Sequence, residues 1–185
     1  MPRIAYLPQD TIEPAALVSA IRARRGGQLL NLDRMLLHSA PLARGWNAFL
    51  GEVRGNLALS PKLRELAICA VAVINGADYE FHHHAPEFIK AGGSREQTTA
   101  LHDPQRALVN DSLFSPAERA VLRLTIAMTR DVKVSDSEFG AARTALPDRE
   151  LVELIGVIAA YNMVSRFLVA LELEPESEQV GTLHR

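Results

Sequence analysis

Helix start and stop signals divide this chain more sharply than any other feature of its sequence. Three capping boxes place a serine three residues before a glutamate or glutamine, so that the two side chains satisfy free N–H groups at a helix start. These boxes are Ser94 with Gln97, Ser115 with Glu118, and Ser135 with Glu138. Ser60 and Pro61 form a further start, and Asn75 and Gly76 form a stop. The pattern predicts consecutive helices.

Between these signals, apolar residues recur at intervals of three and four, the period of a helix with a buried face. Strand signals are nearly absent, because aromatic residues make up only 5% of the chain and no run alternates with period two. We therefore predict an all-α fold with a loop over 102–114 and a frayed polar tail from about residue 175. The predicted helices span about 13–25, 41–54, 61–75, 78–91, 94–101, 116–130, 136–146 and 148–172.

Length and charge limit the class of protein. A length of 185 residues suits a single domain over 1–185, and a net charge of −2 does not favour nucleic acid or an acidic membrane. The lone cysteine, Cys69, excludes a disulfide framework within one chain. The polar N-terminus is unlike a signal peptide, and the apolar runs are too short for a membrane span. We expect a cytoplasmic protein that binds neither nucleic acid nor membrane.

The segment 61–75 is apolar on nearly all sides after Glu65. A helix of this kind must be buried almost completely, which in a chain of this size suggests packing against other subunits as well as its own helices. A carboxylate at the edge of a buried helix needs either a charged partner or a function. Glu65 is therefore a candidate site residue.

The stretch NGADYEFHHH places Glu80, His83 and His84 within five residues, just after a helix stop. Spacings of three and four put both histidines on the helix face of Glu80, whereas His82 points elsewhere. Three interpretations fit: a solvated polar face, a metal site, or a carboxylate–imidazole pair for proton transfer. Di-iron bundles use two Glu-x-x-His units. This chain has only one, and a mononuclear Glu80/His83/His84 site would have poor geometry on one helix face, so we predict no metal.

Residues 57–95, which contain LSPKLRELAICAVAVINGADYEFHHHAPEFIKAGGS, resemble the core of the carboxymuconolactone decarboxylase family, which includes alkyl hydroperoxidase D-like proteins. The flanks 31–50 and 148–173 are also similar to members of this superfamily. The resemblance implies an alkyl hydroperoxidase D-like bundle of about seven or eight helices. It also implies a homo-oligomer, as a dimer, trimer or hexamer.

The peroxidase branch of the family carries two thiols before a histidine. Laid on this chain, its glutamate falls on Glu65 and its histidine on His84, but the thiol positions fall on Ala77 and Glu80. Cys69 lies eight residues before Ala77 among apolar neighbours and cannot replace them. Because thiol–disulfide chemistry needs an attacking and a resolving sulfur, the dithiol route to peroxide reduction is disfavoured.

The decarboxylase branch is more similar, and its reaction removes CO2 from a carboxylated unsaturated lactone without a cofactor. The resemblance implies that His84 donates or accepts the proton, that Glu80 orients it, and that Glu65 relays or abstracts a proton. His83 is the second candidate for the histidine role. We thus predict a Glu/His acid–base enzyme for a small carboxylated or oxidised organic substrate. The alternatives are a peroxidase-type antioxidant protein and a non-catalytic small-molecule binding protein.

Four further residues are candidates for substrate binding. Tyr79 could donate a hydrogen bond, although packing is an equally ordinary role for such a tyrosine. Arg166 has the fork that fits a carboxylate, although a salt bridge is another use for it. Asn162 lies one turn before Arg166, and Asn31, together with His38, precedes the core region and could line the same cavity.

Overall fold

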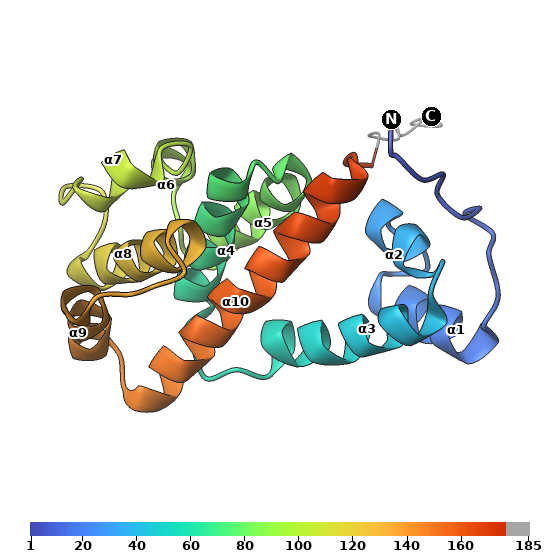
Figure 1. Ribbon diagram of the computed structural model, residues 1–185, viewed down its shortest axis with the longest axis horizontal. Coiled ribbons are helices and arrows are strands. Elements are labelled where there is room, and N and C mark those ends of the chain that lie inside the picture. The colour runs from blue at the N-terminus through green and yellow to red at the C-terminus, as the bar shows by residue number, and fades with distance from the viewer. Residues whose placement is uncertain (177–185) are drawn as a thin grey trace, which may run out of the picture.

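The computed structural model describes residues 1–176, which form helices and no strands (Figure 1). This part of the chain contains ten helices: α1 (Ala15–Arg24), α2 (Asn31–Leu36), α3 (Ala40–Gly55), α4 (Pro61–Asn75), α5 (Asp78–Lys90), α6 (Arg95–Ala100), α7 (Pro104–Leu108), α8 (Pro116–Arg130), α9 (Asp136–Ala145) and α10 (Asp148–Leu171).

The predicted all-α class is confirmed, but residues 1–176 form ten helices rather than seven or eight. The three capping boxes form at the starts of α6, α8 and α9. The short helices α2 and α7 were not predicted, and α7 lies inside the stretch expected to be a loop. Each has at most six residues, too few for a helical period to show in the sequence.

Helix α4 lies at the centre of the fold, in contact with α5, α8 and α10. Every residue from Glu65 to Ala72 is buried. The chain's own helices therefore cover this part of α4, and the expected packing against other subunits stays a prediction.

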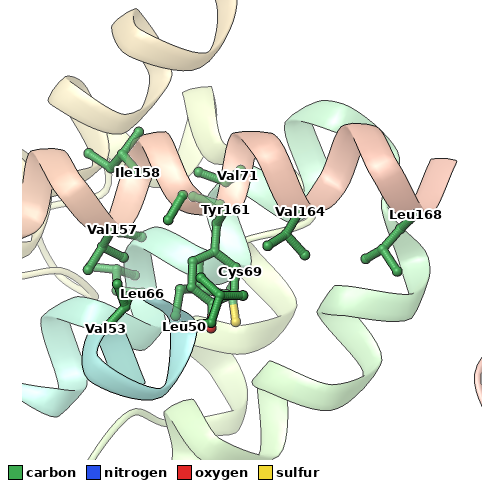
Figure 2. Close-up of a cluster of buried hydrophobic side chains, with 14 of the residues drawn as sticks. Leu50, Val53, Leu66, Cys69, Val71, Val157, Ile158, Tyr161, Val164 and Leu168 are labelled. Carbon is green, nitrogen blue, oxygen red and sulfur yellow. The ribbon is translucent and has the colours of Figure 1, made fainter. Parts of the chain in front are cut away.

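Helix α10 runs diagonally across the molecule, and α3 leads away from it to the N-terminal helices α1 and α2 (Figure 1). Leu50 and Val53 of α3 gather with Leu66 of α4 and with Val157 and Tyr161 of α10 in the core (Figure 2). Among the described helices, α10 alone is long and apolar enough to cross a membrane. Its buried face packs in this core, as does that of many soluble-protein helices that meet the same criterion.

The chain after α10 returns to the N-terminal helices. The Nδ2 of Asn31 donates to the backbone oxygen of Glu174 at 3.1 Å, and the Asn31 backbone N–H donates to Glu176 Oε1 at 2.6 Å. The predicted frayed tail therefore does not begin at residue 175, because Glu176 makes defined contacts. Residues 177–185 of that tail lie outside the described part of the chain.

Candidate active site

A tight turn brings α5 back alongside α4. Gly76 ends α4 with φ of 66°, a left-handed conformation that glycine adopts at little cost. Helix α5 begins two residues later, and the pair α4 and α5 is the most extensively packed in the fold. This arrangement places His84, one and a half turns into α5, against the first turns of α4.

The His84 ring lies between two carboxylates. Its Nδ1 is 2.6 Å from Glu65 Oε2, and its Nε2 is 2.9 Å from Glu80 Oε1, one helical turn earlier on α5. All three side chains are buried. The other oxygen of Glu65 accepts a hydrogen bond from Nε of Arg64 at 3.1 Å. The structure thus joins the three residues in a continuous Glu65–His84–Glu80 chain of proton-carrying groups.

Both carboxylates favour the charged form of the ring. Burial alone would lower the pKa of His84, but Tyr161, Glu65 and Glu80 outweigh it and raise that pKa to about 10. Burial likewise opposes ionisation of the two acids. Their contacts with His84 nevertheless hold the pKa of Glu65 and of Glu80 below the usual value. At neutral pH the chain is an imidazolium between two carboxylates.

These shifts predict how stability depends on pH. Because the pKa of His84 rises from 6.5 to about 10 on folding, its stabilisation is complete below pH 6.5 and lost as pH rises towards 10. The lowered pKa values of Glu65 and Glu80 contribute above about pH 4.5, and that contribution is lost in acid. We expect urea denaturation to show the highest free energy of unfolding between about pH 4.5 and 6.5. A maximum above pH 8 would contradict this charge assignment.

Tyr161 and Arg54 complete the surroundings of His84. The Tyr161 ring meets the His84 ring edge-on, with centroids 5.1 Å apart, and its hydroxyl accepts a hydrogen bond from Arg54 Nε at 2.9 Å. Tyr161 is fully buried. No local sequence pattern relates either residue to His84. Arg54 lies on α3 and Tyr161 on α10, so only the tertiary fold brings them to α5.

The site opens into a pocket of about 380 Å³, within the range of small-molecule sites. Acidic and basic side chains share its wall. Arg24 and Arg25 are held by the buried Asp33, whose oxygens lie 3.6 and 3.2 Å from their nitrogens. The ionic and aromatic lining consists of Arg24, Arg25, Arg54, Arg64, Glu65, Tyr79, Glu80, His83 and His84 among others. Four guanidinium groups at one pocket favour an anionic ligand.

The other predicted site residues divide into two groups. Tyr79 and His83 line the same pocket as Glu80 and His84. Asn31 is not part of that lining, but its backbone N–H donates to Glu176, which also accepts a hydrogen bond from Tyr79. His38 hydrogen-bonds the backbone oxygen of Ala5 instead.

Arg166 and Asn162 do not line the pocket. Arg166 is exposed, and its Nη1 donates to Asn162 Oδ1 at 2.6 Å on the same face of α10. Asn162 also donates to Thr129 Oγ1 at 3.0 Å. The structure corrects their predicted placement in the substrate cavity, because the two side chains contact each other and α8. Tyr161, the residue before Asn162, is the one that reaches His84.

Cys69 is unsuited to redox chemistry. It is fully buried on α4, and burial together with the nearby Glu65 and Glu80 raises the pKa of its thiol well above the usual range. Thiol reactivity requires the thiolate and access to it. Within residues 1–176, no group of three His, Cys, Asp or Glu side chains is arranged to hold a metal ion.

Comparison with known proteins relates this chain to one family and one fold. Residues 40–127 match the model of the Carboxymuconolactone decarboxylase family. Comparison with curated protein sequences finds no match.

Solved structures share the fold at low sequence identity. A peroxidase-related protein from Silicibacter sp. TM1040 aligns with a TM-score of 0.76 and 19% identity, over 92% of this chain and 88% of that one. A putative antioxidant defence protein AhpD from Agrobacterium tumefaciens aligns with a TM-score of 0.70 and 20% identity, over 78% and 97%. The debrominase Bmp8, in complex with 2,3,4-tribromopyrrole, aligns with a TM-score of 0.78 and 16% identity, over 95% and 93%. These similarities establish an alkyl hydroperoxidase D-like fold.

Proposed function

We propose that this chain, of which residues 40–127 match the model of the Carboxymuconolactone decarboxylase family, is a cofactor-independent acid–base enzyme. Its substrate would be a small carboxylated or oxidised organic molecule. The observation that carries the proposal is the Glu65–His84–Glu80 chain, buried and bordering a pocket with four arginines. Perturbed ionisable groups gathered at a pocket are the usual mark of a catalytic site.

In the proposed reaction, the C–CO2⁻ bond breaks and its electron pair moves into the conjugated carbonyl of the substrate. A proton then adds to carbon as the carbonyl re-forms, so that one proton is consumed and one CO2 is released. Arginine side chains at the pocket stabilise the negative charge that develops on the carbonyl oxygen. Arg54 is one candidate for this role, because Tyr161 holds it beside His84 and its charge acts on Glu80.

Glu80 is the residue that we propose to exchange the proton with the substrate. Both ring nitrogens of His84 face carboxylates, so the ring has no free nitrogen for a ligand. Both oxygens of Glu65 are also engaged, one by His84 and one by Arg64. Glu80 contacts His84 through Oε1 and lines the pocket, so its Oε2 is the oxygen that we propose to meet the substrate. A proton can therefore pass from His84 to Glu80 and on to the substrate carbon. This assignment shifts the role expected for His84 from donor to relay.

The proposal is tested by turnover in D2O. Purified protein is incubated with carboxylated unsaturated lactones and with β-keto acids, and CO2 release is followed together with deuterium on the product carbon. We expect CO2 and one deuterium in equal amounts for at least one substrate class. Absence of CO2 release and of carbon-bound deuterium across both classes would refute the acid–base proposal.

Two alternatives give different results in parallel assays. A peroxidase-type antioxidant protein would consume peroxide in the presence of a thiol reductant, which the burial of Cys69 makes unfavourable. A non-catalytic binding protein would bind an anion at this pocket and turn over neither lactone acid nor peroxide.

A homo-oligomer remains part of the proposal. Family resemblance supports it, as do the large apolar side chains Phe49 on α3 and Met163 on α10, which are 49% and 43% exposed. Light scattering of the purified protein would show a monomer mass of 20.3 kDa if this part of the proposal is wrong.

A further inference from the structure

The carboxylate of Glu176 is bound beside the pocket by groups distant in sequence. The Tyr79 hydroxyl donates to its Oε1 at 3.0 Å, and the backbone N–H of Asn31 donates to the same oxygen at 2.6 Å. His83 Nε2 lies 2.8 Å from the other oxygen, Oε2. Oε1 thus accepts two hydrogen bonds, one from α5 and one from the start of α2, whereas the His83 contact at Oε2 is close but not aligned as a hydrogen bond.

The three partners of Glu176 are held in place by the fold. Tyr79 is 3% exposed, and its ring packs on the His83 ring with centroids 4.6 Å apart. The backbone N–H of Leu32 also points to the Tyr79 hydroxyl, at 3.4 Å. We call Tyr79, His83 and the Asn31 backbone N–H the carboxylate cradle. Because its members are fixed by neighbouring helices, the cradle does not depend on Glu176 for its position.

The carboxylate cradle is continuous with the candidate active site. Tyr79 and His83 line the same pocket as Glu80 and His84. His83 and His84 are consecutive on α5, and Tyr79 and Glu80 are consecutive one turn earlier. A small molecule lying in the pocket could therefore place a carboxylate in the cradle while another part of it faces Glu80.

We propose that the carboxylate cradle is a binding subsite for the carboxylate of a small organic acid, and that Glu176 is its intramolecular occupant. Glu176 reaches the cradle from the segment after α10 and competes with a free carboxylate for the same donors. It does so as an anion: although burial opposes its ionisation, contacts with His83 and the Asn31 backbone lower its pKa to about 2.

A tethered competitor weakens every free acid that uses the same groups by one constant factor, which is set by the ratio of the tether's effective concentration to the occupant's own dissociation constant. With an effective concentration on the order of millimolar for a short tether, an occupant whose own dissociation constant is about tenfold lower weakens each free acid about tenfold. Removing the Glu176 carboxylate should therefore tighten the binding of small acids, and it should leave neutral molecules of the same shape unaffected.

The experiment compares 4-fluorobenzoate with neutral 4-fluorobenzyl alcohol, both followed by ¹⁹F NMR titration of the full chain. In Glu176→Ala we expect the dissociation constant of the acid to fall about tenfold relative to the unmodified protein. Glu176→Gln keeps the shape without the charge and should give a smaller decrease. Glu174→Gln is the matched control, because that exposed carboxylate pairs with the N-terminal amine, and it should bind as the unmodified protein does.

A second variant assigns the effect to the cradle. Adding Tyr79→Phe to Glu176→Ala should remove most of the gain for the acid and leave the alcohol unchanged. The proposal is wrong if Glu176→Ala and Glu176→Gln bind the acid no more tightly than Glu174→Gln, or if acid and alcohol gain equally. Should Glu176→Ala fail to fold, the comparison of Glu176→Gln with Glu174→Gln decides the outcome.

The inference rests on the proposed function only in treating the bound acid as a substrate. Binding is measured here without turnover. A catalytically silent chain would fail the D2O assay and still show the Glu176 effect, whereas an active enzyme without a cradle would show the reverse.

Discussion

Replacing His84 with leucine is expected to lower the free energy of unfolding by about 3–5 kcal/mol at pH 7, the usual cost of removing one partner from a buried ion pair. The imidazolium lies between Glu65 and Glu80, at 2.6 and 2.9 Å. Without it, two buried carboxylates face each other with no cation between them. Urea denaturation followed by circular dichroism measures the loss.

The matched control for His84→Leu is His82→Leu, on the same helix at an exposed position. Surface substitutions of this kind change stability by about 0.5 kcal/mol or less. The deficit of His84→Leu should also shrink below pH 5, because protonation removes the repulsion between the two acids. A loss below about 1 kcal/mol, or a deficit that does not change with pH, would show that His84 is not the cation of this site.

Replacing Glu80 with glutamine is expected to lower kcat by about 10²- to 10⁴-fold on any substrate found in the D2O assay, the usual contribution of a positioned acid or base. Glutamine keeps the shape and can still contact His84. It cannot carry a proton from that ring to a substrate carbon. Steady-state kinetics should show the loss in kcat rather than in KM, and circular dichroism should show that the variant remains folded.

Glu96→Gln provides the control for that experiment, because Glu96 is exposed on α6 and lies outside the site. Its kcat should equal that of the unmodified protein. If Glu80→Gln retained full turnover, proton delivery would have to come from His84 or Glu65, and the direction of the relay proposed here would be wrong.

The sequence was informative where local chemistry decides structure. Ser115 and Glu118 satisfy each other's backbone N–H groups within one turn, so their capping box is visible without knowledge of the fold. Helices α2 and α7 gave no such signal, because each is too short to show a period. Burial of α4 was predicted correctly, but not the identity of the helices that cover it, because the sequence of one helix does not show which other helices pack around it.

The candidate site could likewise be predicted only in part from the sequence. Glu80 and His84 lie one turn apart, so their spacing alone predicts that they can meet. Glu65 was a candidate because it lies on a buried helix, but its pairing with the histidine on the next helix was expected only from the family resemblance. Arg54 and Glu176 were missed, since they reach the site from α3 and from beyond α10.

Arg166 shows how a reasonable chemical argument can select the wrong neighbour. Another residue of the same segment, Tyr161, contacts His84. Along a helix, however, a difference of one residue rotates a side chain by about 100°. Tyr161 faces the core, whereas Asn162 and Arg166 share a different, more exposed face. Which face turns inward depends on helix packing rather than on residue chemistry.

The division of the pocket wall between two parts of the chain has an evolutionary consequence. The proton-carrying groups all lie on α4 and α5, whereas Arg24 ends α1 and Arg25 follows it, ahead of the region that matches the family model. Selection can therefore alter which anions are admitted by changing the first 39 residues, while the acid–base machinery stays intact. Related proteins with this arrangement can thus differ in the metabolites they bind while they keep the same glutamate and histidine residues.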